Sequence, residues 1–201
     1  EEAYETLRQR YDGYHFCPNS SGLYNPFSVL LTLSERQYGS YWFSTSTPTY
    51  LVQLMKEADL NPSALSGYEA SASELDSIQI SVDNPIAVLY QSGYLTIKGY
   101  DKEVQLYSLD FPNKEVEEGF IRFLMPMYTA ISELDSPSFV GKFVREVRAC
   151  KVDDFMKRLR ALMADTPYEI IRDLENHYQN VMYIFTRLMG FYTQAEYHTS
   201  C

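Results

Sequence analysis

The residues of this chain that could do chemistry are few and scattered. Its three histidines are His15, His177 and His198, and no two of them share the short spacing that brings metal ligands together on one turn or helix face. We expect His15 to lie in a packed turn with Gly13 at positive φ. We expect His177 to occupy a solvated helix position. A metal site made by this segment alone is therefore not predicted.

The motifs of common catalytic centres are absent from the sequence. There is no phosphate-binding loop of the type G-x-x-x-x-G-K-[ST], no G-x-G-x-x-G after a predicted strand, no H-E-x-x-H and no G-x-S-x-G. No lysine follows an acidic residue at a spacing of two, so the [DE]-x-K pair of many nucleases is also missing. We therefore expect no catalytic residues in this segment.

Charge is distributed unevenly along the chain, whose formal net charge is -10. Residues 1–137 carry 8 basic and 19 acidic side chains, whereas residues 138–165 carry 7 basic and 4 acidic ones. The acidic balance argues against nucleic-acid binding by the whole surface. The residues that could contact phosphates are Lys98 and Lys102 in a predicted hairpin and Lys142, Arg145, Arg148, Lys151, Lys157, Arg158 and Arg160 further on.

Each of these two basic groups has a simpler interpretation. The stretch after residue 138 is typical of a solvated helix face that complements the acidic first part of the chain. In the hairpin, Asp101 and Glu103 flank Lys102 and offset its charge. Nucleic-acid binding by either group stays open as an alternative.

The compartment and the ends of the chain can also be predicted. Cys17, Cys150 and Cys201 are isolated and odd in number, which favours a reducing, cytoplasmic location. No apolar run approaches the ~20 residues that span a bilayer, so no membrane partner is predicted. The first residue is not Met, and the last residues continue an extended pattern. We expect the chain to be an internal segment of a larger protein.

Helix-start signals recur along the first half. Asn25-Pro26, Thr47-Pro48 and Asn84-Pro85 each place a capping side chain before a proline. The apolar spacing predicts helices over 26–37, after Pro48 and over 85–92. Alternation then predicts strands over 94–99 and 104–109. A helix followed by a hairpin is the back half of a winged helix, and 77–82 could supply a short third strand.

From residue 112 onward the apolar spacing is again helical. We predict that Pro126 kinks or ends a first helix, and that 135–138 is a linker. Two amphipathic helices then cover 139–150 and 152–164, and a long helix covers 170–189. Part of the apolar face of the long helix (Val181, Ile184, Phe185 and Leu188) is predicted to be exposed or covered by a neighbouring copy, which would permit self-association. The fold class is therefore mainly α with one small antiparallel hairpin.

Six segments carry a resemblance that spans nearly the whole chain. They are Tyr11-Asp12-Gly13-Tyr14-His15-Phe16, the stretch from Leu23 to Leu30, Tyr41 to Ser46, Leu89 to Tyr100, Phe111 to Val116, and Glu175-x-x-Tyr178-Gln179 with the residues that follow to Ser200. In this order they resemble a large family of bacterial proteins that are predicted AAA-ATPases with a C-terminal PD-(D/E)XK nuclease-like domain.

The resemblance implies an architecture larger than this chain. Residues 1–75 would be the helical, lid-like C-terminal part of an ATPase region. Residues 76–135 would be a winged-helix-like module with a following helix, and 136–201 the first helices and first strand of a nuclease-like domain. ATP and Mg²⁺ would serve the parent protein, with no cofactor bound by this segment alone. Glu175 would match a metal-binding glutamate, together with ligands that this sequence lacks.

Three functions follow as hypotheses. The first is a non-catalytic segment that couples the nucleotide state of an ATPase to a downstream nuclease-like domain, with the rest of its own polypeptide as partner. The second is a winged-helix module that binds DNA. The third is a protein-interaction scaffold that uses exposed tyrosines, of which the chain has 18.

Overall fold

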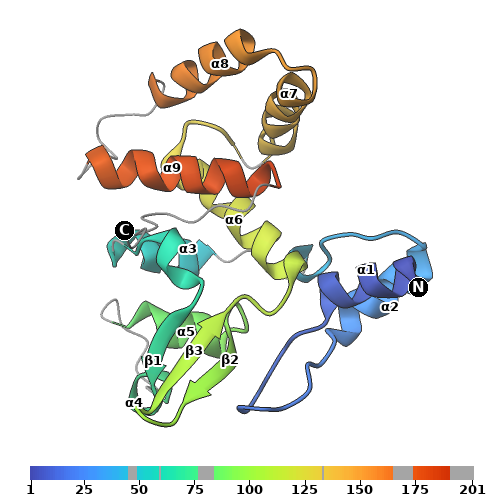
Figure 1. Cartoon of the computed structure of the whole chain (residues 1–201), viewed down its shortest axis with the longest axis vertical. Helices are drawn as coiled ribbons and strands as arrows, with labels where there is room; N and C mark the ends of the chain where they lie inside the picture. Colours follow the sequence, from blue (N-terminus) through green and yellow to red (C-terminus); the bar gives the residue numbers. More distant parts are fainter. Residues whose placement is uncertain (45–48, 59, 77–83, 133, 165–173, 191–201) are drawn as a thin grey trace, which may run out of the picture. The chain divides into compact units, whose positions relative to one another are not determined.

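The computed structural model describes residues 1–44, 49–58, 60–76, 84–132, 134–164 and 174–190 (Figure 1). These residues are mainly helical, with one small antiparallel sheet, as the sequence predicts. The chain divides into two compact units. Unit 1 comprises Glu1–Leu60 and Ala64–Phe120, and unit 2 comprises Asn61–Ser63 and Ile121–Cys201. Each unit is described by itself.

Unit 1 contains a complete winged-helix arrangement. Its elements follow in the order α3 (Thr49–Glu57), β1 (Tyr68–Ser71), α4 (Ala72–Leu75), α5 (Pro85–Gln91), β2 (Thr96–Asp101) and β3 (Leu106–Asp110). The short η2 (Pro62–Leu65) between α3 and β1 contains residues of both units. The strands are antiparallel in the order β1-β3-β2, with a bulge in the β2–β3 pairing between Ile97 and Gly99 (Figure 1). The third strand is thus β1, whereas the predicted one at 77–82 lies outside the described residues.

The predicted starts of α2 (Pro26–Glu35) and α5 are confirmed in detail. The side chain of Asn25 accepts hydrogen bonds from the N–H groups of Phe27 and Ser28 at 3.0 and 3.4 Å. The side chain of Asn84 accepts one from Ala87 N–H at 3.2 Å. Both caps precede a proline, whose missing N–H would have had no partner in the first turn of the helix.

The first helices of the chain, α1 (Glu2–Tyr11) and α2, pack as a pair ahead of the winged helix. Helix α2 has an unusual polarity. Ser28 and Thr32 are its buried residues, while Phe27, Leu30 and Leu33 are 43%, 66% and 63% exposed. An amphipathic helix normally buries its apolar side chains. In α2 the polar side is therefore the inner one.

An aromatic cluster connects η1 (Trp42–Ser44) with the rest of unit 1. The Trp42 ring meets Phe43 and Tyr94 edge-on, with ring centroids 5.1 and 4.7 Å apart. Tyr94 in turn lies 5.3 Å from Phe120 in α6 (Lys114–Tyr128). Burial raises the pKa of the Tyr94 phenol to about 12. These rings hold the short η1 turn against α6.

Gly119 in α6 makes room for one of these rings. A Cβ atom at Gly119 would lie 2.0 Å from Cε2 of Phe43. We expect Gly119→Ala to lower the free energy of unfolding by about 1–3 kcal/mol, because the ring must leave its contacts with Trp42 and Tyr94. Urea unfolding followed by fluorescence of Trp42, the single tryptophan, measures this.

Gly99→Ala is the matched control for Gly119→Ala. The nearest atom to a Cβ at Gly99 is Cβ of Ser108, at an ordinary 3.8 Å. The control should change the free energy of unfolding by no more than about 0.5 kcal/mol. Equal effects of the two substitutions would contradict the packing of Phe43 on α6.

Unit 2 is a helical assembly built from the end of α6, α7 (Ser136–Arg148), α8 (Val152–Ala164) and α9 (Leu174–Leu188). Phe143 of α7 is fully buried at its centre. The Phe143 ring lies 4.1 Å from Phe185, 5.4 Å from Phe155 and 5.2 Å from Phe139, measured between centroids. Three helices therefore share one aromatic core.

Some predictions about this half of the chain are wrong, and others stay predictions. Val181, Ile184 and Phe185 of α9 are fully buried within the chain, so most of the face predicted to be exposed is covered, while Leu188 is half-buried; self-association stays a prediction. Residues 136–138 form the first turn of α7 instead of a linker, since proline is tolerated there. Helix α6 does not end at Pro126 but runs two residues beyond it, while a kink at Pro126 stays a prediction. The division into two compact units falls between Phe120 and Ile121, inside α6, and the three domains with boundaries at 75/76 and 135/136 stay a prediction.

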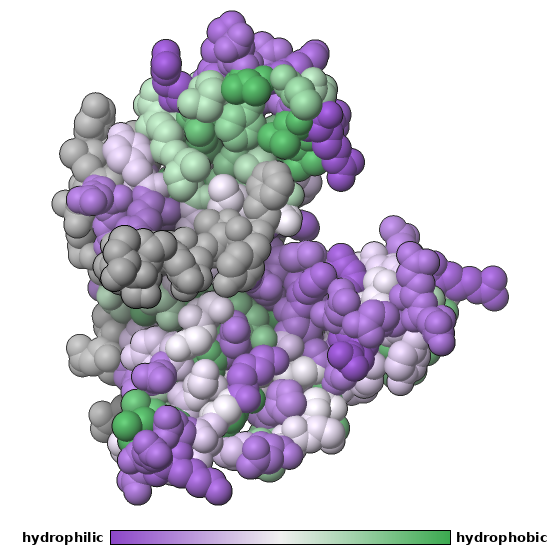
Figure 2. Space-filling view, viewed as in Figure 1, coloured by the Kyte–Doolittle hydropathy of each residue, from purple (hydrophilic) through white to green (hydrophobic). Residues whose placement is uncertain are grey.

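The surface of unit 2 shows hydrophobic residues gathered over α7 and α8, with hydrophilic residues around them (Figure 2). Val147 in α7 and Val152 and Met156 in α8 are 39%, 65% and 50% exposed. Among the described helices none has both the length and the apolar character that crossing a bilayer requires.

Candidate functional site

A buried carboxylate in the first turn of α6 accepts hydrogen bonds from two other segments of unit 1. Glu115 is fully buried, and its Oε1 atom accepts three hydrogen bonds. The donors are the Ser28 hydroxyl at 3.0 Å and the backbone N–H groups of Tyr41 and Trp42 at 2.6 and 3.1 Å. One oxygen atom thus links three segments that are far apart in sequence. They are α2, the start of η1 and α6 itself.

Local sequence explains why Glu115 is in place to accept these bonds. Asn113 caps α6, because its Oδ1 accepts a hydrogen bond from Val116 N–H at 3.1 Å. A carboxylate in the first turn of a helix is stabilised by the helix dipole. Ser28 lies inside α2 on the same side as Thr32, one turn later. The inward polar side of α2 is therefore the side that meets the Glu115 carboxylate.

The pKa of Glu115 depends on its burial and on the hydrogen bonds that only one of its two carboxylate oxygens accepts. Burial raises its pKa, and the hydrogen bonds from Ser28, Trp42 and Tyr41 oppose that shift. Its Oε2 atom is buried and accepts no hydrogen bond within the described part of the chain. Burial and the Glu115 charge also raise the pKa of Tyr14, whose hydroxyl is likewise buried without a partner there. The Glu115 carboxylate therefore binds one side-chain hydroxyl and two backbone N–H groups of the described residues.

A second polar link in unit 1 uses a predicted site residue. Lys98 extends from β2, and its Nζ atom donates hydrogen bonds to the carbonyl oxygens of Gly13 and Pro112 at 3.1 and 3.0 Å. Burial lowers the pKa of Lys98, and Asp110 and Asp12 oppose this shift. The ammonium group therefore fixes two loops against the sheet and is not presented at a hairpin tip.

Sequence reasoning did not identify Ser28, Tyr14 or Glu115 as a group. All three lie in segments that carry the family resemblance, but the order of these segments along the chain does not show that they meet in space. One signal was available. Ser28 and Thr32 are polar residues at a spacing of four within the mainly apolar run from Phe27 to Leu33, which indicates a polar contact on that side.

The described residues of the winged helix do not form a positively charged surface of the kind that contacts DNA. Residues 85–89 of α5, the helix that precedes the hairpin, are all buried, and α5 contains no basic residue. Lys102 lies exposed in the hairpin turn, where Asp101 Oδ1 accepts hydrogen bonds from Glu103 N–H and Val104 N–H. Lys98 and Lys102 are thus not brought together as a patch. Their role in DNA binding stays a prediction.

The other basic candidates all lie in unit 2. Arg158 of α8 is engaged, because its Nε donates to both carboxylate oxygens of Glu146 in α7, at 2.9 and 3.1 Å. This pairing lowers the pKa of Glu146 and lies beside the Phe143 ring. The rest are exposed and form no ion pair with the described residues: Lys142, Arg145, Arg148, Lys151, Lys157 and Arg160.

Helix α9 holds the predicted metal ligand and an unexpected histidine. Glu175 is exposed in the first turn, and the described residues contain no group of three or more His, Cys, Asp or Glu side chains that could hold a metal ion. The described residues therefore do not form a Mg²⁺ site around Glu175. His177 is only 6% exposed, not solvated, and burial lowers its pKa. Its ring lies 6.1 Å from that of Tyr128.

Comparison with known proteins gives one relative. No family model matches the chain, and no solved structure matches it. It is similar to a protein of Azotobacter chroococcum mcd 1 described as "Uncharacterized protein in vnfD 5'region". The two are 28% identical over 207 residues, which cover 98% of this chain. The chain spans 39% of the length of that relative.

Proposed function

We propose that this chain is a non-catalytic connecting and regulatory segment of a larger AAA-ATPase-like protein with a nuclease-like C-terminal domain. In this proposal unit 1 is a stiff body that responds to the nucleotide state of the ATPase part. ATP and Mg²⁺ act in the parent protein, and Glu175 contributes to a metal site only together with ligands from outside this chain. The isolated cysteines support a cytoplasmic location.

The observation that carries the proposal is the use of two charged side chains in unit 1, the buried Glu115 and the exposed Lys98. The Oε1 atom of Glu115 and the Nζ atom of Lys98 both form hydrogen bonds that link one part of unit 1 to another. Catalytic groups, in contrast, need access to a substrate. An arrangement that fixes backbone segments favours a mechanical role over a chemical one.

The outer face of α2 supports a role in connecting domains. Phe27, Leu30 and Leu33 are exposed on one helix, and the relative is much longer than this chain. Exposed apolar residues that gather on one element mark interaction surfaces. We propose that a neighbouring part of the same polypeptide covers this face.

Two charge reversals on α2 test the proposal. Leu30→Glu with Leu33→Glu should leave the unfolding free energy of the isolated chain within about 0.5 kcal/mol, because both side chains are exposed. In the full-length protein the same pair should change the rate of ATP hydrolysis at least about 5-fold, the lower end of ordinary coupling between sites. Steady-state phosphate release measures this rate.

Val104→Glu is the control for this pair, since Val104 is 59% exposed at the hairpin turn, away from α2. It should leave ATP hydrolysis unchanged. The proposal is refuted if the α2 pair and the control hydrolyse ATP at the same rate as the unaltered protein. It is also refuted if the isolated chain itself hydrolyses ATP.

A further inference from the structure

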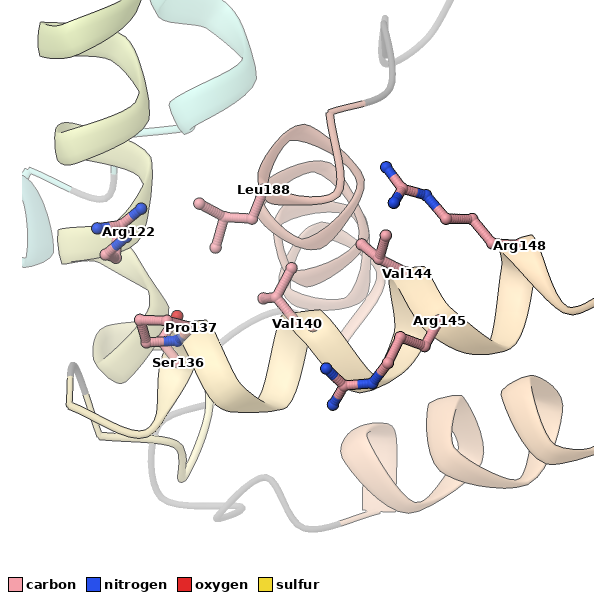
Figure 3. A pocket seen from close by; sticks show the side chains of 9 residues that line it. Arg122, Ser136, Pro137, Val140, Val144, Arg145, Arg148 and Leu188 are labelled. Carbon is pink, nitrogen blue, oxygen red and sulfur yellow. The ribbon is translucent and has the colours of Figure 1, made fainter. Parts of the chain in front are cut away.

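Unit 2 contains an open hollow of about 370 Å³ between the end of α6, α7 and α9. Its floor is apolar and is made by Val140 and Val144 of α7 and Leu188 of α9. Arg122 of α6 and Arg145 and Arg148 of α7 stand around it (Figure 3). We call these six residues the arginine groove. All six belong to unit 2, so the groove is contained within one unit.

The three guanidinium groups form no ion pair in the described part of unit 2, although Glu146 lies close enough to Arg145 for the arginine charge to lower the pKa of that glutamate. No acidic side chain lines the hollow. By contrast, Arg158 on the neighbouring helix is held by Glu146. The planar guanidinium group binds carboxylates through two parallel hydrogen bonds. Three unpaired arginines around one hollow therefore favour an anionic ligand.

The apolar floor of the arginine groove favours an anionic ligand that also carries an apolar group. Val140 is buried, and Val144 and Leu188 are half-buried; the side chains of Val140 and Leu188 point toward one another in Figure 3. The phosphate backbone of a nucleic acid presents charge and sugar to a protein, with no apolar side chain to cover such a floor. An amphipathic peptide presents both kinds of group at once.

We propose that the arginine groove binds an acidic peptide segment of a protein partner. One apolar side chain of the segment rests on Val140, Val144 and Leu188, and flanking carboxylates pair with Arg122, Arg145 and Arg148. The proposal is independent of the connecting role of unit 1, because it rests on residues of unit 2 alone.

Peptide binding to the purified chain tests the proposal. The probe is a fluorescein-labelled peptide with glutamates on both sides of a central Leu-Phe pair, followed by anisotropy at about 0.05 M salt, where ion pairs are weakly screened. Arg145→Gln with Arg148→Gln should weaken its binding at least about 10-fold. Replacing the Leu-Phe pair by Ser-Gly should weaken binding by a similar factor, because the floor then loses its contact.

Lys157→Gln with Arg160→Gln is the matched control. It removes the same charge from exposed positions on α8, outside the groove, and should weaken peptide binding less than about 2-fold. Equal losses in the two double variants would overturn the proposal, because binding would then follow net charge alone. The proposal also fails if the probe does not bind, or if a short DNA duplex binds more tightly and loses affinity in the groove variant.

Discussion

Glu115→Ala is expected to lower the free energy of unfolding of unit 1 by about 3 kcal/mol. The substitution leaves the Ser28 hydroxyl and the N–H groups of Tyr41 and Trp42 without their common acceptor in a buried place. A buried donor that loses its partner costs about 1–3 kcal/mol. Urea unfolding followed by Trp42 fluorescence measures the loss.

Glu115→Gln separates the hydrogen bonds from the charge. Its side-chain carbonyl can accept the same three bonds, and it carries no charge that must be buried. We expect its free energy of unfolding at neutral pH to lie within about 1 kcal/mol of the unaltered chain. A loss as large as that of Glu115→Ala would mean that the charge, and not the acceptor geometry, holds the three segments together.

The difference in unfolding free energy between the unaltered chain and Glu115→Gln should also depend on pH. Because burial raises the pKa of Glu115 in the folded chain, the folded state holds this proton more tightly than the unfolded state does. The stability that the unaltered chain has relative to Glu115→Gln should therefore fall as pH rises from the ordinary glutamate pKa through the raised one. Above the raised pKa the difference should level off. A difference that grows with pH in this range would contradict the cause given for the shift.

Gly13→Ala is expected to lower the free energy of unfolding by about 3–5 kcal/mol, an effect similar to that of Glu115→Ala, because backbone strain and overpacking add together. Gly13 has φ +114°, which an L side chain rarely adopts, and an added Cβ would lie 2.1 Å from the carbonyl oxygen of Pro112. That oxygen also accepts a hydrogen bond from Lys98. The substitution therefore strains the backbone and forces apart two loops that Lys98 holds together. The same urea titration measures it.

Gly67→Ala separates these two causes. Gly67 also has positive φ (+72°), but no atom lies within 4 Å of the position of an added Cβ. It should therefore show only the cost of the left-handed conformation, about 1–2 kcal/mol. If Gly13→Ala costs no more than Gly67→Ala, the close approach of Gly13 to Pro112 is not present in solution.

The elements of this chain could be predicted where their causes are local. The caps Asn25 and Asn84 and the alternation in β2 and β3 depend on neighbouring residues, and all of them gave the right element. The mainly helical class followed from the same signals. Strand β1 could not be predicted in this way. Its four residues pair with β3, which is more than thirty residues away in sequence.

The candidate site could be predicted only in part, because its contacts are not local. The apolar spacing in α2 gave the helix but not its orientation, and Ser28 faces inward since Glu115 lies there. The same limit explains the error at α9. Its apolar face was correctly identified, but its cover includes Phe143, a residue more than thirty positions earlier. His177 was misplaced for the same reason, because its polarity does not reveal the helix face on which it lies.

Amide hydrogen exchange at Tyr41 and Trp42 tests most directly the claim that Glu115 joins unit 1 into one body. Both N–H groups donate to the Glu115 carboxylate from a segment outside the sheet. We predict that they exchange as slowly as the amides shared by β2 and β3, and that Glu115→Ala removes this protection while Glu115→Gln retains it. Exchange at loop-like rates in the unaltered chain would contradict the claim.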